Sequence, residues 1–385
     1  MKYFDFAATT PMCNQALSAY QEAAQHFFGN SSSLHDVGTS AAFILKECRR
    51  KLAAMLDVPF EGIYFTSGGT ESNLLAILSL ARKMKKSGKH IITSLAEHTS
   101  VHAAMNVLQQ EGFEITRLPF TNKGIINTSE LQDCIRDDTV LIAIQHVNQE
   151  IGTIQPVRSI GSIAKERGIL FHCDAVQSFG KLDLKEMTAY VDSLSVSSHK
   201  IYGPKGTGAV YINPRCAWEP VFPGLTHEKG FRGGTVDVPS IAAFLAAAEH
   251  SCKPKETANT WKKRRLLMNE LTHPAITLAE GDEIHQLPST VGIRISGVEG
   301  QLVMLACNQK GFAISTGSAC QVGHDNGMKA VVAMGWTEEE AKQFFRISFS
   351  EESTEEDVIQ LGKTINSIAQ AHIPLHFSDS HIMVK

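Results

Sequence analysis

The fold of this chain is decided by the stretch Val191-Asp192-Ser193-Leu194-Ser195-Val196-Ser197-Ser198-His199-Lys200. Its alternating apolar residues predict a β-strand that ends in small hydroxyl side chains, a histidine and one lysine. A glycine-rich turn, residues 201–208, leads into a second short strand over residues 209–213. Upstream, the apolar run 168–173 predicts another strand, which delivers Asp174. Lys200 and Asp174 are therefore expected at neighbouring strand ends.

A lysine beside an acid suggests a specific cofactor. Pyridoxal phosphate needs a lysine for its Schiff base and an acid that keeps its pyridine nitrogen protonated, so that the ring can act as an electron sink. Lys200 and Asp174 fit these two needs. The alternative for this pair is a solvated lysine at a strand end and an aspartate that caps a helix. Other residues of the chain are needed to distinguish the cofactor site from this structural alternative.

The composition is that of an ordinary globular protein. The 385 residues are 43% hydrophobic and 20% charged, and the net charge of −4 gives no electrostatic reason to expect direct binding of nucleic acid. We expect no secretion signal and no membrane association, because no basic leader and no bilayer-length apolar stretch is visible. The eight cysteines form no C-x-x-C pair, which predicts no metal site and no disulfide framework and favours a reducing cytoplasm.

Strand and helix patterns alternate from about residue 15 to residue 213. The strands are predicted over residues 63–66, 89–93, 113–118, 140–144 and 169–173, with helices between them. This βαβ order predicts an α/β fold with a mostly parallel sheet flanked by helices. Thr70, His98, Asn148 and Asp174 fall just past strand ends. Ligands bind at the carboxyl ends of the strands in such sheets, so these residues are candidates for one site.

The pattern changes after a helix predicted over residues 238–252. The segment Lys253-Pro254-Lys255 breaks that helix, and an α+β pattern follows. We predict a large domain over residues 15–250 and a smaller α+β domain over residues 251–385, joined by residues 1–14.

Four further features can carry chemistry, and each has an ordinary structural alternative. Segment 67–73 opens a helix where its glycines and Thr70 can bind phosphate, although threonine is also a common helix cap. His98 can likewise be a capping or surface histidine. Cys320 lies among small residues, where it can be a reactive or an inert thiol. Arg346 lies within an apolar strand, where it needs an anion from either a protein carboxylate or a substrate.

Seven segments of the chain together resemble one family. They are Asp5-Phe6-Ala7-Ala8-Thr9-Thr10-Pro11, Ser67-Gly68-Gly69-Thr70-Glu71-Ser72-Asn73, Glu97-His98, His146-Val147-Asn148-Gln149-Glu150-Ile151-Gly152, Asp174-Ala175-Val176-Gln177-Ser178, Ser197-Ser198-His199-Lys200 and Gly317-Ser318-Ala319-Cys320. The chain resembles the cysteine desulfurases of the NifS/IscS type, which are class-V, fold-type I pyridoxal-phosphate enzymes. The resemblance implies a mostly parallel seven-stranded sheet in the large domain, pyridoxal phosphate as cofactor, and a homodimer with active sites near the subunit interface.

The resemblance also implies how the cofactor is held. Lys200 would carry it, Asp174 would pair with its pyridine nitrogen, and His98 would stack on its ring and shuttle protons. Gln177 would bind the phenolic oxygen, with Asn148 near that oxygen and the substrate. The phosphate would be bound by Thr70, Ser197 and His199, and by Thr235 of the other subunit.

Two residues would act on the substrate, L-cysteine. Arg346 would bind its carboxylate, and Cys320 would take its sulfur as a persulfide and release alanine. The sulfur would pass to an acceptor protein for iron–sulfur assembly, thio-cofactor synthesis or tRNA thiolation. Residues 320–335 resemble the longer cysteine loop of the NifS/IscS group rather than the short loop of the SufS group. Gln321-Val322-Gly323-His324 departs from the family pattern there, which leaves the identity of the acceptor open.

Other functions remain compatible with this pattern. A second class-V activity, selenocysteine lyase or aminotransferase, would make Cys320 dispensable. A non-catalytic pyridoxal-phosphate scaffold in sulfur delivery would be expected to lack at least one reactive group. The joint presence of Lys200, Asp174, His98, Arg346 and Cys320 argues against such a scaffold.

Overall fold

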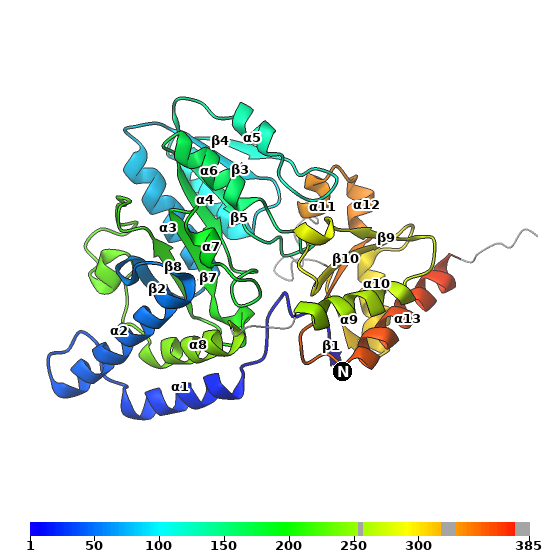
Figure 1. Ribbon diagram of the computed structural model, residues 1–385, viewed down its shortest axis with the longest axis horizontal. Coiled ribbons are helices and arrows are strands. Elements are labelled where there is room, and N and C mark those ends of the chain that lie inside the picture. The colour runs from blue at the N-terminus through cyan, green and yellow to red at the C-terminus, as the bar shows by residue number, and fades with distance from the viewer. Residues whose placement is uncertain (253–256, 317–328, 374–385) are drawn as a thin grey trace, which may run out of the picture.

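A seven-stranded sheet forms the centre of the computed structural model, which describes residues 1–252, 257–316 and 329–373 (Figure 1). In spatial order its strands are β2 (Ile63–Thr66), β8 (Gly208–Ile212), β7 (Ser193–Ser197), β6 (Leu170–Asp174), β5 (Thr139–Gln145), β3 (His90–Ser94) and β4 (Glu114–Leu118). Strand β8 runs antiparallel to its neighbours, β2 and β7. The other neighbours are parallel, so the predicted α/β fold with a mostly parallel sheet is confirmed.

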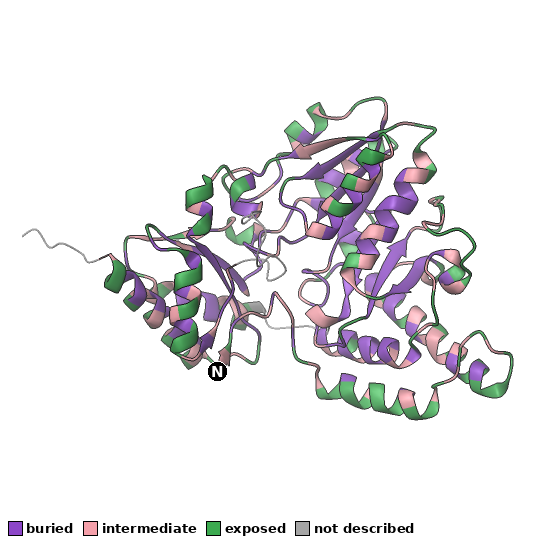
Figure 2. Ribbon diagram, turned by 180° about the vertical axis from the view of Figure 1, so that it is seen from behind, coloured by how far each residue is buried: buried purple, intermediate pink, exposed green. Residues whose placement is uncertain are grey.

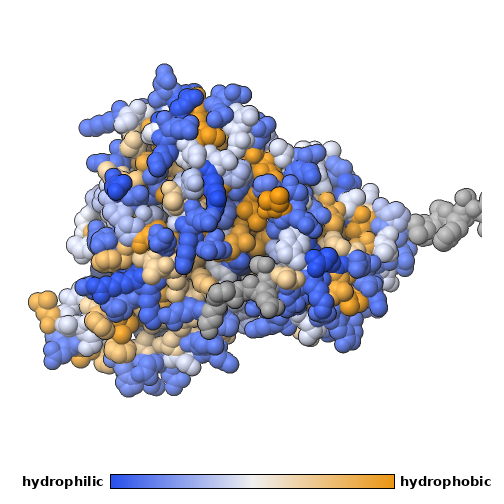
Figure 3. Space-filling view, in the orientation of Figure 1, coloured by the Kyte–Doolittle hydropathy of each residue, from blue (hydrophilic) through white to orange (hydrophobic). Residues whose placement is uncertain are grey.

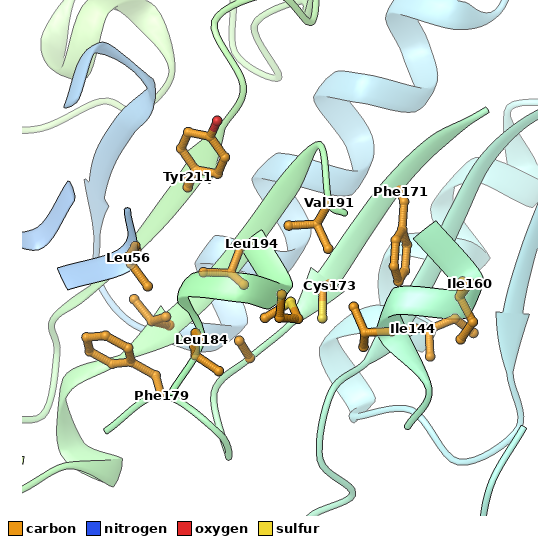
Figure 4. Packing of buried hydrophobic residues seen from close by; sticks show 14 of the residues in the cluster. Leu56, Ile144, Ile160, Phe171, Cys173, Phe179, Leu184, Val191, Leu194 and Tyr211 are labelled. Carbon is orange, nitrogen blue, oxygen red and sulfur yellow. The ribbon is translucent and has the colours of Figure 1, made fainter. Parts of the chain in front are cut away.

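Helices cover both faces of this sheet because its strands are apolar on both sides. On one face lie α3 (Gly69–Met84) and α4 (Thr99–Gln110), and on the other lie α2 (Asp36–Leu56), α6 (Val157–Glu166) and α8 (Val238–Ser251). Successive residues of β5 alternate between the two faces: Leu141 packs with the first pair, and Ile144 packs with the second set. Figure 4 shows Ile144 near Phe171 and Cys173 in the second layer, with Leu194 on the other side of Cys173.

A smaller antiparallel sheet lies beside the large one. It consists of β12 (Phe344–Ser348), β10 (Thr290–Ile295) and β9 (Ile276–Ala279). The surrounding helices are α9 (Thr257–Glu270), α10 (Gly300–Gln309), α11 (Lys329–Ala333), α12 (Glu338–Lys342) and α13 (Glu355–His372). A separate apolar cluster, which includes Ile293, Phe345 and Leu361, fills the space between this sheet and its helices. Figure 2 shows that both sheets are buried. The predicted boundary between two domains at residue 250 stays a prediction.

The N-terminal segment joins the two parts of the molecule. Strand β1 (Lys2–Tyr3) pairs in parallel with β11 (Phe312–Ala313) on the side of the small sheet. The chain then crosses to α1 (Asn14–His26), which lies against α8 in Figure 1. Ala16 of α1 packs against Ala243 and Ala247 of α8, where small side chains allow a close approach. The remaining short helices are α5 (Thr128–Asp133), α7 (Lys185–Thr188) and the 3₁₀ turns η1 (Phe60–Gly62), η2 (Ser198–Lys200), η3 (His227–Gly230) and η4 (Glu283–His285).

Most predicted strands of the large sheet differ from the structure by about one residue at an end, and the end of β7 differs most. Strand β7 ends at Ser197, and His199 and Lys200 belong to the 3₁₀ turn η2. The backbone turns there because the amides of Ile201 and Gly203 both donate to the carbonyl oxygen of Ser198. Lys200 therefore projects from a turn beyond the sheet.

Two predictions concern residues that the structure describes only in part. The predicted helix break at 253–255 lies outside the described residues, as does 320–328 of the predicted cysteine loop. Residues 329–333, at the end of that loop, form α11.

The surface carries mostly hydrophilic side chains on the face drawn in Figure 3. Within the described residues, no helix combines the length and the apolar character that a membrane crossing requires.

Candidate active site

A cavity of about 570 Å³ lies beyond the carboxyl ends of β2, β3, β5, β6 and β7. Its lining includes most of the residues that the sequence singled out: Thr70, His98, Asp174, Gln177, Ser197, His199, Lys200 and Arg346. The lining also includes Ala7, Ala8 and Thr9 of the N-terminal segment. Residues from both ends of the chain thus share one cavity with the strand ends.

Three of the predicted residues do not appear in this lining. Asn148 is buried, and its amide is occupied: its Oδ1 accepts from the backbone amides of Glu150 (2.9 Å) and Ile151 (3.0 Å). Its Nδ2 donates to the carbonyl oxygen of Ala96. Asn148 thus stabilises a turn in this structure. Thr235 is exposed, and Cys320 lies outside the described residues.

The lysine ammonium is held by the N-terminal segment. Lys200 Nζ donates to the carbonyl oxygens of Ala7 (2.7 Å) and Ala8 (2.8 Å). Gln177 Nε2 donates to the same oxygen of Ala7 at 2.9 Å. One residue earlier, the carbonyl oxygen of His199 accepts from the amide of Thr10 at 2.9 Å. The turn η2 is thereby fixed against residues 7–10, with the lysine at the cavity wall.

The acid at the end of β6 has both carboxylate oxygens in hydrogen bonds. Asp174 Oδ2 accepts from Asn73 Nδ2 at 2.7 Å, and Oδ1 accepts from the backbone amide of Val176 at 3.0 Å. Asp174 is only 7% exposed, yet it lines the cavity. The two donors fix the orientation of the carboxylate. The contact with the amide two residues on is of the kind that a capping aspartate makes, and the same side chain lines the cavity.

His98 both caps a helix and lines the cavity. Its Nδ1 accepts from the backbone amide of Ser100 at 3.2 Å, which caps the N-terminus of α4. Burial lowers the pKa of His98, and the nearby charges of Lys200 and Lys329 lower it further, while Asp174 acts in the opposite direction. Its ring is therefore neutral at physiological pH. His98 therefore caps α4, as one interpretation of the sequence predicted, and the same side chain is also placed in the cavity lining.

The start of α3 and the end of β7 form a cradle that suits a phosphate. Gly68 has φ +141°, and no side chain among the described residues caps the helix that begins at Gly69. A Cβ on Gly69 would lie 2.7 Å from a methyl group of Val176, so only glycine fits there. Beside them the hydroxyl of Ser197 is buried and has no hydrogen-bond partner within the described parts of the chain. Free helix N–H groups and an unpaired hydroxyl fit an anionic group.

His199 adds a polar group to the same wall. Its Nδ1 lies 3.1 Å from the hydroxyl of Thr9. Burial lowers the pKa of His199 to about 4, and the nearby Lys200 contributes to this effect. His199 is therefore neutral and can offer a hydrogen bond to a phosphate without carrying charge.

Arg346 is a further cationic residue in the lining of the cavity. It lies on β12, is 2% exposed, and donates from Nη2 to Asp5 Oδ1 at 2.6 Å and from Nη1 to the carbonyl oxygen of Gln149 at 2.8 Å. Its Nε is buried and has no partner among the described residues. The carboxylate of Asp5 thus binds one nitrogen of the guanidinium, which agrees with the predicted alternative of a protein carboxylate as the anion. The unpaired Nε leaves a donor for a ligand.

Sequence reasoning missed the roles of Asp5 and Asn73. Both residues lie inside the segments that carry the family resemblance, but their partners are distant in sequence: Asp5 pairs with Arg346, and Asn73 binds Asp174. The sequence shows that Asp5 and Asn73 are polar. It does not show their contacts, because these depend on how distant parts of the chain pack together.

Comparison with known proteins places the chain in a family. The model of the family described as "Aminotransferase class-V" matches residues 2–361. The chain belongs to the class-V aminotransferases. It is 45% identical over 366 residues to a protein of Bacillus subtilis (strain 168) named "Putative cysteine desulfurase NifS", with 94% of this chain and 93% of the relative covered. The predicted family resemblance is confirmed.

Two solved structures show the same fold in this class-V family. One is named "NIFS-LIKE PROTEIN", has a TM-score of 0.87 and 30% identity, and covers 96% of this chain and 99% of its own. The other is described as "SspA in complex with cysteine", has a TM-score of 0.81 and 35% identity, and covers 91% of this chain and 99% of its own. The family implies pyridoxal phosphate as the cofactor, and the cradle beside Ser197 fits its phosphate.

Proposed function

We propose that this protein is a pyridoxal-phosphate-dependent cysteine desulfurase that converts L-cysteine to L-alanine and a persulfide on Cys320. The observation that carries the proposal is one cavity that combines Lys200, Asp174 and the partly unpaired Arg346. The name of the Bacillus subtilis relative agrees with it, as does the complex of the structural neighbour SspA with cysteine.

The cavity residues would hold the cofactor by their chemical character. Lys200 would form the covalent link, Asp174 would bind the pyridine nitrogen, and Gln177 would bind the phenolic oxygen. The phosphate would be bound by Thr70, Ser197 and His199, and by Thr235 of a second subunit. When bound, pyridoxal phosphate supplies an electron sink for the substrate.

The chain's own residues account for the remaining steps. Arg346 would bind the substrate carboxylate through charge-assisted hydrogen bonds. The Cys320 thiolate would form a bond to the substrate sulfur while the bond between that sulfur and Cβ breaks. Cβ would gain a proton, with His98 as the transferring group. Cysteine and the Cys320 thiol would thus yield alanine and the Cys320 persulfide, with no external oxidant.

Three further features remain proposals from the resemblance and the cysteine pattern. They are a homodimer, transfer of sulfur to an acceptor protein such as an iron–sulfur scaffold or a thiolation enzyme, and a cytoplasmic location. The two-domain division at residue 250 is proposed on the same footing. The apolar cluster of the small sheet supports it, whereas the larger cluster also takes in residues beyond 250, among them Ala330 and Phe344.

Replacement of the reactive cysteine tests the proposed activity. Cys320→Ser should retain bound pyridoxal phosphate and still change its absorption spectrum on addition of cysteine, but it should form neither alanine nor sulfide. Cys252→Ser, at an exposed cysteine elsewhere in the chain, is the matched control and should turn over cysteine normally. Wild-type turnover by Cys320→Ser would favour the selenocysteine lyase or aminotransferase alternative. Failure of the wild-type protein to bind pyridoxal phosphate would exclude the whole proposal.

A further inference from the structure

A chain of buried hydrogen bonds connects the two residues that are expected to touch opposite parts of the cofactor. Asn73 Nδ2 donates to Asp174 Oδ2 at 2.7 Å and to Ser100 Oγ at 3.0 Å. Ser100 Oγ in turn lies 2.7 Å from His98 Nδ1. Asn73 is 1% exposed and Ser100 is 3% exposed, so water cannot easily replace these contacts. Asp174 and His98 are thus joined through two side chains.

The orientation of the Asn73 amide is fixed by a residue outside the cavity. His172 Nε2 lies 3.1 Å from Asn73 Oδ1, and His172 Nδ1 lies 3.0 Å from the hydroxyl of Ser193. Burial lowers the pKa of His172 to about 3, so its ring is neutral. Because Asn73 Oδ1 can only accept, His172 Nε2 must carry the ring proton, and Nδ1 must accept from Ser193. A flipped amide would place Oδ1 against the Asp174 carboxylate.

The same logic fixes the proton on His98. Asn73 Nδ2 donates to Ser100 Oγ, which leaves the hydroxyl hydrogen of Ser100 to donate to His98 Nδ1. The backbone amide of Ser100 donates to the same nitrogen. A ring nitrogen that accepts from two donors cannot hold a proton itself. The neutral ring therefore carries its proton on Nε2.

We propose that Asn73, held by His172, is a positioning residue that orients the Asp174 carboxylate and, through Ser100, sets His98 as the tautomer with its proton on Nε2. In this form Nε2 of His98 presents a proton to the cavity. Within the proposed desulfurase reaction, on which this consequence rests, transfer of that proton to Cβ would be matched by return of the Cys320 thiol proton to Nε2, so that the ring stays neutral. The tautomer itself is a property of the chain and does not depend on that reaction.

The tautomer can be measured directly in the purified, cofactor-loaded protein. Long-range ¹H–¹⁵N correlation spectra of protein labelled with ¹⁵N-histidine separate protonated from unprotonated ring nitrogens, and His98→Gln identifies the His98 signals. We expect a protonated Nε2 and an unprotonated Nδ1 at neutral pH. A proton on Nδ1, or a doubly protonated ring, would overturn the proposal. This measurement remains decisive even if the proposed enzymatic activity fails.

The hydroxyl of Ser100 can be tested separately from Asp174. Ser100→Ala removes one of the two donors to His98 Nδ1 and should increase the population of the other tautomer, whereas Ser100→Thr should restore the wild-type spectrum. Ser79→Ala removes a buried hydroxyl that has no partner among the described residues, on the same helix as Asn73, and serves as the control. An unchanged His98 spectrum in Ser100→Ala would mean that the hydroxyl does not set the tautomer.

Two substitutions of Asn73 distinguish positioning from packing. Asn73→Ala removes the donor to Asp174, and a lost hydrogen bond to a charged group should weaken pyridoxal-phosphate binding about ten- to hundredfold. Asn73→Asp preserves the shape but places a second carboxylate against Asp174, so we expect weaker binding than in Asn73→Ala. If packing alone mattered, the isosteric Asn73→Asp would bind better than Asn73→Ala. That order, or unchanged binding in both variants, would overturn the proposal. Thermal unfolding checks that each variant is folded.

Discussion

Arg346 and Asp5 form a buried ion pair in which Nη2 of the arginine donates to Oδ1 of the aspartate at 2.6 Å. The side chain of Arg346 is 3% exposed and that of Asp5 is 17% exposed. Asp5 comes from the N-terminal segment and Arg346 from β12, so the pair ties residues that are distant in sequence to one wall of the cavity. Breaking a buried pair by removal of one partner leaves an uncompensated charge, which is destabilising.

Removal of the arginine should weaken substrate binding. Arg346→Ala loses charge-assisted hydrogen bonds to the cysteine carboxylate, each worth roughly 1.5–3 kcal/mol, so kcat/KM should fall about ten- to hundredfold through a higher KM. Steady-state kinetics with L-cysteine measure this change. Asp5→Asn is the matched control, because it removes the charge of the partner and keeps the guanidinium, and its KM should not rise comparably. An unchanged KM together with a lower melting temperature in Arg346→Ala would identify the arginine as purely structural.

The unpaired hydroxyl of Ser197 should matter for the cofactor and not for the fold. Ser197→Ala removes a buried polar group that has no partner in the described structure, so the free energy of unfolding of cofactor-free protein should stay equal or rise. Affinity for pyridoxal phosphate should fall about tenfold or more, because a hydrogen bond to a charged group is lost. Equilibrium dialysis and chemical unfolding measure the two effects. Ser195→Ala, at another buried hydroxyl on β7 without a partner in the described ranges, should leave the affinity unchanged.

Asp174→Asn should preserve the fold and lose most of the activity. The amide keeps an acceptor for the Val176 amide but cannot hold the pyridine nitrogen protonated. We expect a native circular dichroism spectrum, bound cofactor and a large fall in kcat. Undiminished turnover would show that Asp174 has another role.

Glu97 should make stability depend on pH. Burial raises the pKa of this carboxyl from 4.5 to about 8, against the hydrogen bonds from Ser94 and Gln145. The unfolded chain releases the proton near pH 4.5 and the folded chain near pH 8, so the free energy of unfolding should fall as pH rises through this window. Glu97→Gln should remove this part of the dependence, and its stabilisation relative to the wild type should be largest above about pH 8. Urea unfolding at several pH values measures the free energy of unfolding, and Glu130→Gln, at an exposed glutamate, is the control. If the free energy of unfolding depended on pH in the same way in the wild type and in Glu97→Gln, the raised pKa of Glu97 would be contradicted.

The sequence predicted the large sheet well because its strands are apolar on both faces. Residues 63–66 were predicted to the residue, since turn-forming neighbours, Gly62 and the segment Ser67-Gly68-Gly69, bound this run. The two-residue strands β1 and β11 were missed, because so short a run has no periodicity and exists only through pairing across the whole chain. The end of β7 was placed too late, because the bonds to the Ser198 carbonyl that turn the backbone are not visible in residue types.

The candidate site divides in the same way. Lys200, Asp174 and His98 were recognisable because reactive side chains near strand ends are unusual. Arg346 was recognisable because an arginine within an apolar strand needs an anion. The role of Asn148 stays a prediction, and residue types alone do not show that its amide oxygen is engaged by two backbone amides of its own turn. The contact between Asn73 and Asp174 could not be predicted, since it depends on how closely α3 approaches the end of β6.

The hydrogen bonds from Lys200 to Ala7 and Ala8 have a consequence for the order in which the protein folds during translation. Residues 2–10 are translated long before their partners, since β1 pairs with β11 and the amide of Ala7 is bonded to Ser348 Oγ on β12. Contacts of such high sequence separation form late and slowly. The cavity can therefore close only after translation has passed β12, and residues 2–10 of a nascent chain must stay without these partners until then. A substitution in residues 2–10 would act at this late step of maturation rather than on the folding of the large sheet.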